Sequence, residues 1–357
     1  MGIEGMMEEN KPLAPFTTFG IGGPARWFVE AGCEKEIADA TGWARERGLP
    51  LFVLGGGSNL LVADGGFEGL VLKLGNRWIA SAKARDGSGQ MIYGAGAGTD
   101  WDAFVERTVQ DGCAGVECLA GIPGTVGGTP VQNVGAYGQE VASVISQVHA
   151  IDLRDMSIGP LSRAECRFGY RRSRFNTVDR GRFIVTRVDY RLTPGGAPTV
   201  GYPDLERAIE TELKGNAPAL AEVAAVVRKV RQSKGMLLVE GDPNCRSAGS
   251  FFKNPVVDAA AVRKIAEVSG KELPTFPAGE DGVGLVKVPA AWLIENAGFS
   301  KGYALGAAGI STRHTLALIN RGGATAAEIL ALAERISEAV EARFGIVLER
   351  DPVLLGF

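Results

Sequence analysis

The sequence predicts an α+β fold of two or three domains, and three observations support that class. The chain has 357 residues, which is enough for more than one sizeable core. Apolar residues make up 45% of it, so a packed globular protein is expected. Segments with strand and helix patterns follow one another along the chain. The 50 glycines, about twice the usual ~7% share, indicate many tight loops between them.

The first of these units covers residues 25–75. The segments over 26–31, 34–48 and 49–55 read as a strand, a helix and a strand. A glycine-rich loop and another strand follow. This is the pattern of a small α+β unit.

A second unit begins near Met91, where a glycine-rich strand end leads into a helix with Thr99 or Asp100 as its N-cap. Residues 121–140 hold six glycines and two prolines, which exclude a helix or a central strand and predict a long structured loop. A third unit starts near residue 236. The other elements expected are strands over 144–153, 181–192, 199–203, 314–320 and 345–357, and helices over 203–214, 218–234, 258–269, 289–297 and 324–343.

Composition excludes several classes of function. A formal net charge of −3 gives no electrostatic case for nucleic acid or for an anionic membrane as partner. The five cysteines form no Cys-x-x-Cys pair, and the chain has two histidines, so no metal site is indicated. No apolar stretch of 18 residues and no signal peptide are seen. We therefore expect a cytoplasmic, metal-free protein with reduced thiols. Separately, a monomer is expected.

The stretch "VLGGGSNLLV", residues 53–62, places three consecutive glycines between two apolar runs. It can be a plain β-turn, or a loop whose N–H groups converge on an anion that bare backbone lets approach. A Walker phosphate loop is excluded because no lysine comes after it until Lys73. A Rossmann fingerprint is excluded because Leu60 stands where its third glycine belongs. The next residues, 59–75, have a strand-like pattern, so the loop joins two strands.

Motifs along nearly the whole chain together resemble one family. They are "FTTFGIGGPA" (16–25), "LGGGSNLLV" (54–62), "AGIPGTVGGTPVQNVGAYG" (120–138), "CRFGYRRSRF" (166–175), "AGSFFKNP" (248–255), "AAWLIENAG" (290–298) and "STRHTLALIN" (311–320). In this order and spacing they are similar to the UDP-N-acetylenolpyruvoylglucosamine reductases. "VGYPDL" and the length look like the longer subtype of that family, which has a tyrosine-bearing substrate loop.

The resemblance implies an FAD-binding fold of the vanillyl-alcohol-oxidase type in two parts, residues 1–80 and 81–235, plus a C-terminal α/β substrate-binding domain over 236–357. It implies non-covalent FAD, NADPH as transient hydride donor, and a UDP-sugar as the small-molecule substrate. The glycine loop would cradle the FAD pyrophosphate, and the 121–140 loop would pack around the rest. The cofactor-binding residues implied are Gly55, Gly56, Gly57, Ser58, Asn59, Leu60, Gly121, Ile122, Pro123, Gly124, Gly127, Gln132, Asn133 and Gly135.

The resemblance also implies the catalytic groups. Ser250 matches the serine that protonates the substrate carbanion, although the motif alone would fit a turn hydroxyl. Arg171 matches the arginine that holds the substrate carboxylate, since a guanidinium pairs with it bidentately. The family carries a glutamate near its C-terminus, where this chain reads "LERDPV". Register places Asp351 there; Glu349, on the same face of an extended strand, is the alternative.

Five further residues correspond to substrate-binding positions of the family. Apart from the resemblance, Tyr202 would be interpreted as strand-end packing, and Lys234 as a cation at the C-terminus of a helix. Two rival functions stay open: a flavin oxidase of the same fold, and a non-catalytic nucleotide-sugar binder, which the aspartate at the glutamate position suggests. The substrate-binding residues expected are Tyr170, Tyr202, Lys234, Asn254 and Asn296.

Overall fold

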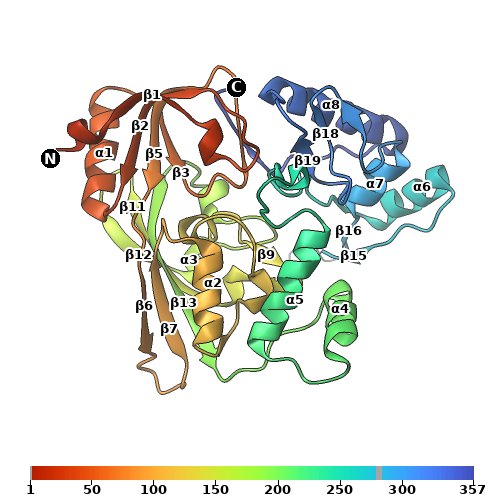
Figure 1. The fold of residues 1–357 in the computed structure, drawn as a ribbon, viewed down its shortest axis with the longest axis horizontal. Helices are drawn as coiled ribbons and strands as arrows, with labels where there is room; N and C mark the ends of the chain where they lie inside the picture. The colour runs from red at the N-terminus through yellow and green to blue at the C-terminus, as the bar shows by residue number, and fades with distance from the viewer. Residues whose placement is uncertain (1, 279–283) are drawn as a thin grey trace. The chain divides into compact units, whose positions relative to one another are not determined.

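The computed structural model describes residues 2–278 and 284–357, and its chain divides into two compact units. The first unit comprises the segments up to Lys11, Ala25–Gly56 and Glu68–Ser233. The second comprises Pro12–Pro24, Gly57–Phe67 and Lys234–Phe357. Figure 1 follows the chain by colour through both. The chain changes unit between Gly56 and Gly57, inside the glycine-rich loop. Separate domains over 1–80 and 81–235 stay a prediction.

The first unit contains a four-stranded sheet of order β1-β2-β5-β3. The helix α1, Glu34–Glu46, buries Ile37, Ala40 and Ala44, which share one face at helical spacing. The parallel pairing of β3 with β5 requires the crossover that the intervening loop and β4 provide. The strands are β1 Glu8–Pro12, β2 Pro24–Ala31, β3 Leu51–Leu54 and β5 Phe67–Leu74.

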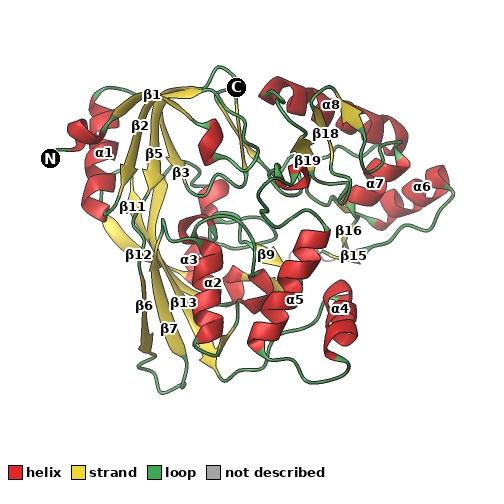
Figure 2. Ribbon diagram, viewed as in Figure 1, coloured by secondary structure: helices red, strands yellow, loops and turns green. Residues whose placement is uncertain are grey.

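A second, antiparallel sheet of the first unit has the order β12-β11-β13-β7-β6, with β8 paired to the end of β13. The helix α2 packs beside it (Figure 2). The rings of Phe104 in α2 and Tyr190 in β13 are 4.7 Å apart. The strands are β6 Ile79–Lys83, β7 Met91–Gly96, β8 Cys113–Ala114, β11 Ile145–Asp152, β12 Ile158–Ser162 and β13 Phe183–Pro194. The short strands β9 Gly135–Ala136 and β10 Gln139–Glu140 form a hairpin. The helices are α2 Trp101–Gln110, α3 Arg163–Cys166, α4 Pro203–Leu213 and α5 Leu220–Ser233.

The second unit is built around α8, whose apolar face is buried along its length. Two three-stranded sheets, β14-β16-β15 and β17-β18-β19, and the parallel pair β20-β4 accompany it. The helices are α6 Ala259–Ser269, α7 Ala290–Asn296 and α8 Ala326–Phe344. The strands are β4 Leu60–Val62, β14 Val256–Val257, β15 Phe276–Pro277, β16 Val286–Lys287, β17 Ala304–Leu305, β18 Ala308–Ile310, β19 Leu318–Asn320 and β20 Val353–Leu355.

The α+β class expected from the sequence is confirmed, and each helix named above from the sequence is present. Asp100, rather than Thr99, caps α2, accepting a hydrogen bond from the N–H of Ala103. The strand expected over 199–203 is wrong, because Pro203 occupies the first turn of α4, where proline is tolerated. The strand expected over 345–357 is reduced to β20, because Gly345 caps α8 in the left-handed region and Pro352 lacks an N–H.

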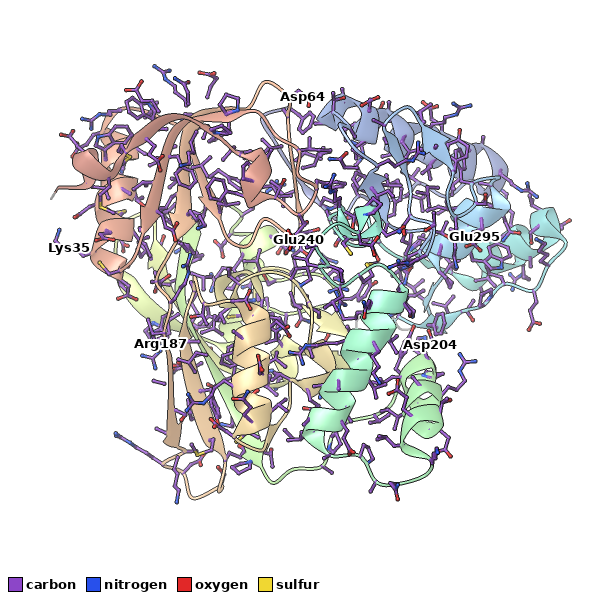
Figure 3. The ribbon with its side chains drawn as sticks, in the orientation of Figure 1. Lys35, Asp64, Arg187, Asp204, Glu240 and Glu295 are labelled. Carbon is purple, nitrogen blue, oxygen red and sulfur yellow. The ribbon has the colours of Figure 1, made fainter. Side chains whose placement is uncertain are left out.

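The N-terminus of α8 is held by a carboxylate from the loop after β4. Asp64, labelled in Figure 3, accepts hydrogen bonds from the N–H groups of Ala326 (2.8 Å) and Ala327 (3.1 Å). The side chain of Thr325 accepts a hydrogen bond from the N–H of Glu328 in a capping box. Three of the helix's free N–H groups are thus satisfied.

The substitution Asp64→Ala is expected to destabilise the second unit by about 1 kcal/mol, because two N–H groups and a favourable charge at the helix N-terminus lose their partner. Urea unfolding, followed by the fluorescence of Trp292 in a variant lacking the other tryptophans, measures it. Asp39→Ala, which removes an exposed pair with Lys35 on α1, is the control and should leave the midpoint unchanged. A midpoint for Asp64→Ala equal to that of the parent contradicts the capping role.

Candidate cofactor and active site

The first two glycines of the glycine-rich loop pack against the 121–140 loop. A Cβ on Gly56 would lie 2.5 Å from the Cα of Gly124, and one on Gly55 would lie 2.9 Å from the Oγ1 of Thr125. These are closer than real Cβ contacts, so only bare backbone fits. The two loops expected to bind the cofactor are therefore in direct contact within the first unit.

The third position of the loop, residue 57, requires glycine for a different reason. Gly57 has φ +62, and a Cβ there would lie 1.8 Å from the carbonyl oxygen of Phe16. The carbonyl of Gly57 accepts a hydrogen bond from the N–H of Thr18, whose hydroxyl donates to the carbonyl of Ser247 at 2.5 Å. Within the second unit, Thr18 thus links the glycine loop to the segment that leads to Ser250. The segment "FTTFG" was part of the resemblance, but sequence reasoning gave Thr18 no role.

The start of the 121–140 loop is clamped by side chains from two helices. Asp102 of α2 accepts the N–H of Gly121 at 2.6 Å and pairs with Arg228 of α5 at 2.8 Å. Arg231 of α5 donates from Nε to the carbonyl of Gly121 at 3.0 Å. Burial, with the nearby charge of Arg171 adding to it, holds the pKa of Arg231 below its ordinary value. The loop's backbone is therefore fixed from both sides of one glycine.

The residues present fit an FAD cofactor. The hydroxyl Oγ1 of Thr125 is buried and has no hydrogen-bond partner in the described chain, where a ligand oxygen can supply one. The side chain of Gln132 is half-buried and bonds to no described residue. The Gly55–Gly57 backbone offers N–H groups without side chains beside them. Thr125 was missed, although its place between Gly124 and Gly127 marked it.

Asn133 has a structural role within the first unit. It is buried, and its amide donates to Glu140 at 3.0 Å and to the carbonyl of Gly169 at 3.1 Å, while its oxygen accepts the N–H of Ala142. Its side chain therefore ties the 121–140 loop to the turn that carries Arg171. A cofactor contact by Asn133, expected from the sequence, stays a prediction.

Arg171 lies in a tight turn closed by two hydrogen bonds between the backbones of Gly169 and Arg172, 2.9 and 3.1 Å. It adopts the left-handed conformation, with φ +54, which a long side chain rarely takes. The residue is half-buried, and its guanidinium forms no ion pair with any residue of the described segments. Backbone strain at an unpaired arginine is typical of a functional position.

Two tyrosines expected to bind substrate are exposed to about the same extent, Tyr170 at 38% and Tyr202 at 37%. The ring of Tyr202, just before α4, lies edge-on to that of Tyr137, with centroids 5.8 Å apart. Tyr137 itself has φ +50. The structure thus brings Tyr202 against the 121–140 loop.

In the second unit, the structure brings Asn59, Asp351 and the segment of Ser250 together. The amide of Asn59 donates to the carbonyl of Asp351 at 3.1 Å, and the N–H of Asp351 donates to the carbonyl of Phe251 at 3.0 Å. Phe252 and Arg350 form an antiparallel bridge beside them. Residues 292 positions apart in sequence therefore form one cluster.

The two acidic candidates near the C-terminus have different environments. The side chain of Glu349 is 73% exposed and pairs with Lys253. The Oδ1 atom of Asp351 is buried. The hydroxyl of Ser250 is half-buried and makes no hydrogen bond within residues 2–278 and 284–357, so its proton is not committed to another residue.

The remaining candidates lie in separate places of the second unit. Burial, with the charges of Lys234 and Lys301, lowers the pKa of His314 to about 4, so Lys234 has a neutral imidazole beside it at neutral pH. Asn254 accepts the N–H of Ala290 at the start of α7. Asn296, at the other end of α7 and about 9 Å along its axis, bonds to Lys271 and to the carbonyl of Trp292. The structure does not bring these two asparagines together.

Among residues 2–278 and 284–357, no helix is long and apolar enough to cross a membrane. No group of three or more His, Cys, Asp or Glu side chains there is arranged to hold a metal ion.

Comparison with known proteins agrees with this arrangement. The family model "FAD binding domain" matches residues 25–156, and the model "UDP-N-acetylenolpyruvoylglucosamine reductase, C-terminal domain" matches residues 242–355. A UDP-N-acetylenolpyruvoylglucosamine reductase of Thermobifida fusca is 45% identical over 352 residues, 97% of each chain. The chain belongs to the UDP-N-acetylenolpyruvoylglucosamine reductase family. That of Pseudomonas aeruginosa is 39% identical over 350 residues, 98% of each chain.

A crystal structure of the same family has the same fold. The UDP-N-acetylenolpyruvylglucosamine reductase of Thermus caldophilus superposes with a TM-score of 0.65 at 28% identity, covering 98% of this chain and 99% of that one. The FAD-binding model includes both glycine-rich loops, and the C-terminal model includes Ser250 and Asp351. The expected combination of an FAD-binding part with a C-terminal reductase domain is therefore confirmed.

The substitution Gly56→Ala is expected to weaken FAD binding about ten- to hundredfold, because relieving a contact with the Gly124 backbone costs about 1–3 kcal/mol. Flavin absorbance relative to protein after gel filtration, and FAD titration of the stripped protein, measure it. Gly42→Ala, inside α1 with nothing within 4 Å of the added Cβ, is the matched control and should keep its flavin. Full flavin content in Gly56→Ala would show that FAD binding does not require the close contact between Gly56 and the Gly124 backbone.

Proposed function

We propose that this protein is an FAD-dependent reductase that uses NADPH to reduce the enolpyruvyl ether of UDP-N-acetylglucosamine enolpyruvate. The product is the lactyl ether, UDP-N-acetylmuramate, a precursor of peptidoglycan. The observation that carries the proposal is similarity over 97% of the chain to a protein named for this reaction, together with a glycine cradle that fits FAD. When bound, FAD would supply the hydride-transfer chemistry between NADPH and the methylene carbon of the substrate.

The direct test mixes the protein with NADPH and UDP-N-acetylglucosamine enolpyruvate and follows the product by mass. Gain of two hydrogen atoms in the sugar nucleotide, with one NADPH consumed for each, supports the reductase. Oxidation of NADPH by dioxygen with no reduced sugar supports the oxidase alternative. Substrate binding without any NADPH consumption supports the non-catalytic binder.

The role proposed for Arg171 is to hold the substrate carboxylate. As the substrate gains a hydride, negative charge develops on the enolate that includes this carboxylate. A guanidinium with no ion pair among the described residues can pair with it bidentately, and the pairing strengthens as charge grows. A preorganised donor of this kind contributes about 3–4 kcal/mol to lowering a barrier.

The role proposed for Ser250 is to give its hydroxyl proton to the carbon next to the carboxylate. The carbon–hydrogen bond forms as the O–H bond breaks, leaving a serine alkoxide that a proton from water restores. An alcohol is a weak acid at neutral pH, but an enolate carbon is basic enough to accept its proton. Phe251 and Phe252, the next two residues of the chain, are buried. The role proposed for them is to keep water away from the Ser250 hydroxyl.

The third catalytic group proposed is Asp351. Its buried carboxylate oxygen and its backbone bonds to Asn59 and Phe251 support this choice over Glu349, whose exposed side chain pairs with Lys253. The aspartate side chain is one methylene shorter than the family glutamate. In this chain the 349–351 backbone is held against the segment of Ser250, which fixes where the shorter carboxylate lies.

The finer proposals concern binding and location. Tyr170, Tyr202, Lys234, Asn254 and Asn296 are proposed to bind the UDP-sugar. Gly55, Gly56, Gly57, Ser58, Asn59 and Leu60 are proposed to bind FAD with the 121–140 loop. We propose that the protein acts as a monomer in the cytoplasm, where its five free cysteines would stay reduced.

The substitution Ser250→Ala is expected to lower kcat about 10²- to 10⁴-fold, because the proton donor is lost while the substrate still binds. Reduction of the flavin by NADPH, followed at its absorbance band under anaerobic conditions, should keep the parent rate. Ser233→Ala, at the exposed end of α5, is the control and should keep the parent kcat. If Ser250→Ala keeps the kcat of the parent, another group donates the proton to the substrate carbon.

The pair Asp351→Ala and Glu349→Ala separates the two acidic candidates. Asp351→Ala is expected to lower kcat at least about a hundredfold, the scale that a misplaced catalytic group costs. Glu349→Ala removes an exposed ion pair and should stay within about twofold of the parent. Steady-state turnover with NADPH and the enolpyruvyl substrate measures both variants. A larger loss of kcat in Glu349→Ala than in Asp351→Ala would assign the catalytic role to Glu349.

A further inference from the structure

The conformation of Arg171 needs an explanation outside the turn itself. A left-handed residue next to a tight-turn closure is usually glycine or asparagine, because a Cβ crowds the backbone there. Arg171 holds this conformation at φ +54. The direction in which its side chain leaves the backbone depends on keeping that conformation, so a neighbour that stabilises it also aims the guanidinium.

Asn176 makes the contact that does this. Its side-chain amide donates a hydrogen bond to the carbonyl oxygen of Arg171 at 3.1 Å. Its side-chain oxygen accepts the N–H of Ser173 at 2.9 Å, inside a capping box of the one-turn helix Arg174–Asn176. One side chain therefore fixes the carbonyl of Arg171 relative to the helical turn that comes after it.

Two further hydrogen bonds hold the two ends of the turn. Asn133 donates to the carbonyl of Gly169, and the hydroxyl of Ser173 donates to the carbonyl of Val131 at 2.7 Å. These bonds attach the turn to the 121–140 loop. An asparagine amide thus holds the carbonyl of Gly169, before the strained residue, and a second one holds the carbonyl of Arg171, the strained residue itself.

The segment around Asn176 does not need this amide to fold. Arg174 pairs with Asp179 at 2.7 Å, and Arg182 pairs with Asp179 at 2.9 Å and with Asp152 at 2.6 Å. These side chains are mostly buried, and the two arginines lie over the ring of Phe183. A substitution that removes only the amide donor of Asn176 therefore leaves the main anchor of the segment in place.

We propose that Asn176 is a positioning residue for Arg171, and that its amide holds the arginine backbone so that the guanidinium binds the substrate carboxylate. The proposal rests on the role proposed above for Arg171. It predicts that loss of the Asn176 amide weakens binding of the substrate carboxylate but leaves binding of the nucleotide part and of the flavin unchanged.

The test compares Asn176→Asp with Asn176→Ala, Arg171→Ala and the double variant Asn176→Asp/Arg171→Ala, all as FAD-loaded protein. The aspartate keeps the oxygen that caps Ser173 but has no N–H for the carbonyl of Arg171. Thr177→Val is the matched control: it removes a hydroxyl bond to the carbonyl of Ser173 in the same segment and leaves that of Arg171 untouched. Turnover is one readout. The other is calorimetric affinity of the oxidised protein for UDP-N-acetylmuramate, which has the carboxylate, and UDP-N-acetylglucosamine, which lacks it.

The expected result is a kcat about 10- to 100-fold lower in both Asn176 variants, the cost of a small misplacement. Affinity for UDP-N-acetylmuramate should fall about tenfold while that for UDP-N-acetylglucosamine and the flavin content stay at parent values. In the Arg171→Ala background, Asn176→Asp should have no further effect, which excludes a through-space effect of the new charge. Thr177→Val should stay within twofold of the parent.

Three outcomes overturn the proposal. If Arg171→Ala is damaging but both Asn176 variants lie within twofold of the parent, Asn176 does not position it. If the Asn176 variants weaken both nucleotides equally or lose flavin, the residue supports the fold alone. If Arg171→Ala itself keeps turnover and carboxylate affinity, the role of Arg171 fails, and the positioning role of Asn176 fails with it.

Discussion

The constraint on which the site depends is the close approach of backbone to backbone at the three consecutive glycines. Gly56 lies against the main chain of Gly124, and Gly57 lies against the carbonyl of Phe16. A side chain at either position would separate the segments that meet there. Protein packing therefore explains the glycines, because it uses the space where their Cβ atoms would be. The proposed binding of phosphate oxygens by their N–H groups is compatible with that packing.

Small neutral side chains then hold the loops that carry the charged ones. Asn59 reaches the carbonyl of Asp351, Asn133 that of Gly169, and Asn176 that of Arg171. Each joins a side-chain amide to a backbone carbonyl, a bond that needs no counter-ion and adds no charge. Arg171 can therefore stay without an ion pair among the described residues, which agrees with the role proposed for it.

The C-terminal acid shows how register and environment combine. Sequence register alone placed Asp351 at the family glutamate position and kept Glu349 as an alternative on the same strand face. The structure separates them, because residues 349–351 lie beside the segment of Ser250 and Lys253, and the lysine pairs with the exposed glutamate. This chain has aspartate where the family has glutamate, and hydrogen bonds to Asn59 and Phe251 fix the backbone of that aspartate. The fixed backbone determines how far the shorter side chain extends.

Local pattern in the sequence determined the α+β class, the helices, and the glycine loop as a strand-to-strand connection, because periodicity, caps and glycine content act over a few residues. The resemblance named the cofactor, the reaction and the candidate side chains. Tertiary structure alone decided that Asn59 bonds to Asp351, that Asn133 bonds to the turn of Arg171, and that Thr18 bonds to the carbonyl of Ser247. These contacts join residues far apart in sequence, and no local periodicity encodes which distant carbonyl a small polar side chain will meet.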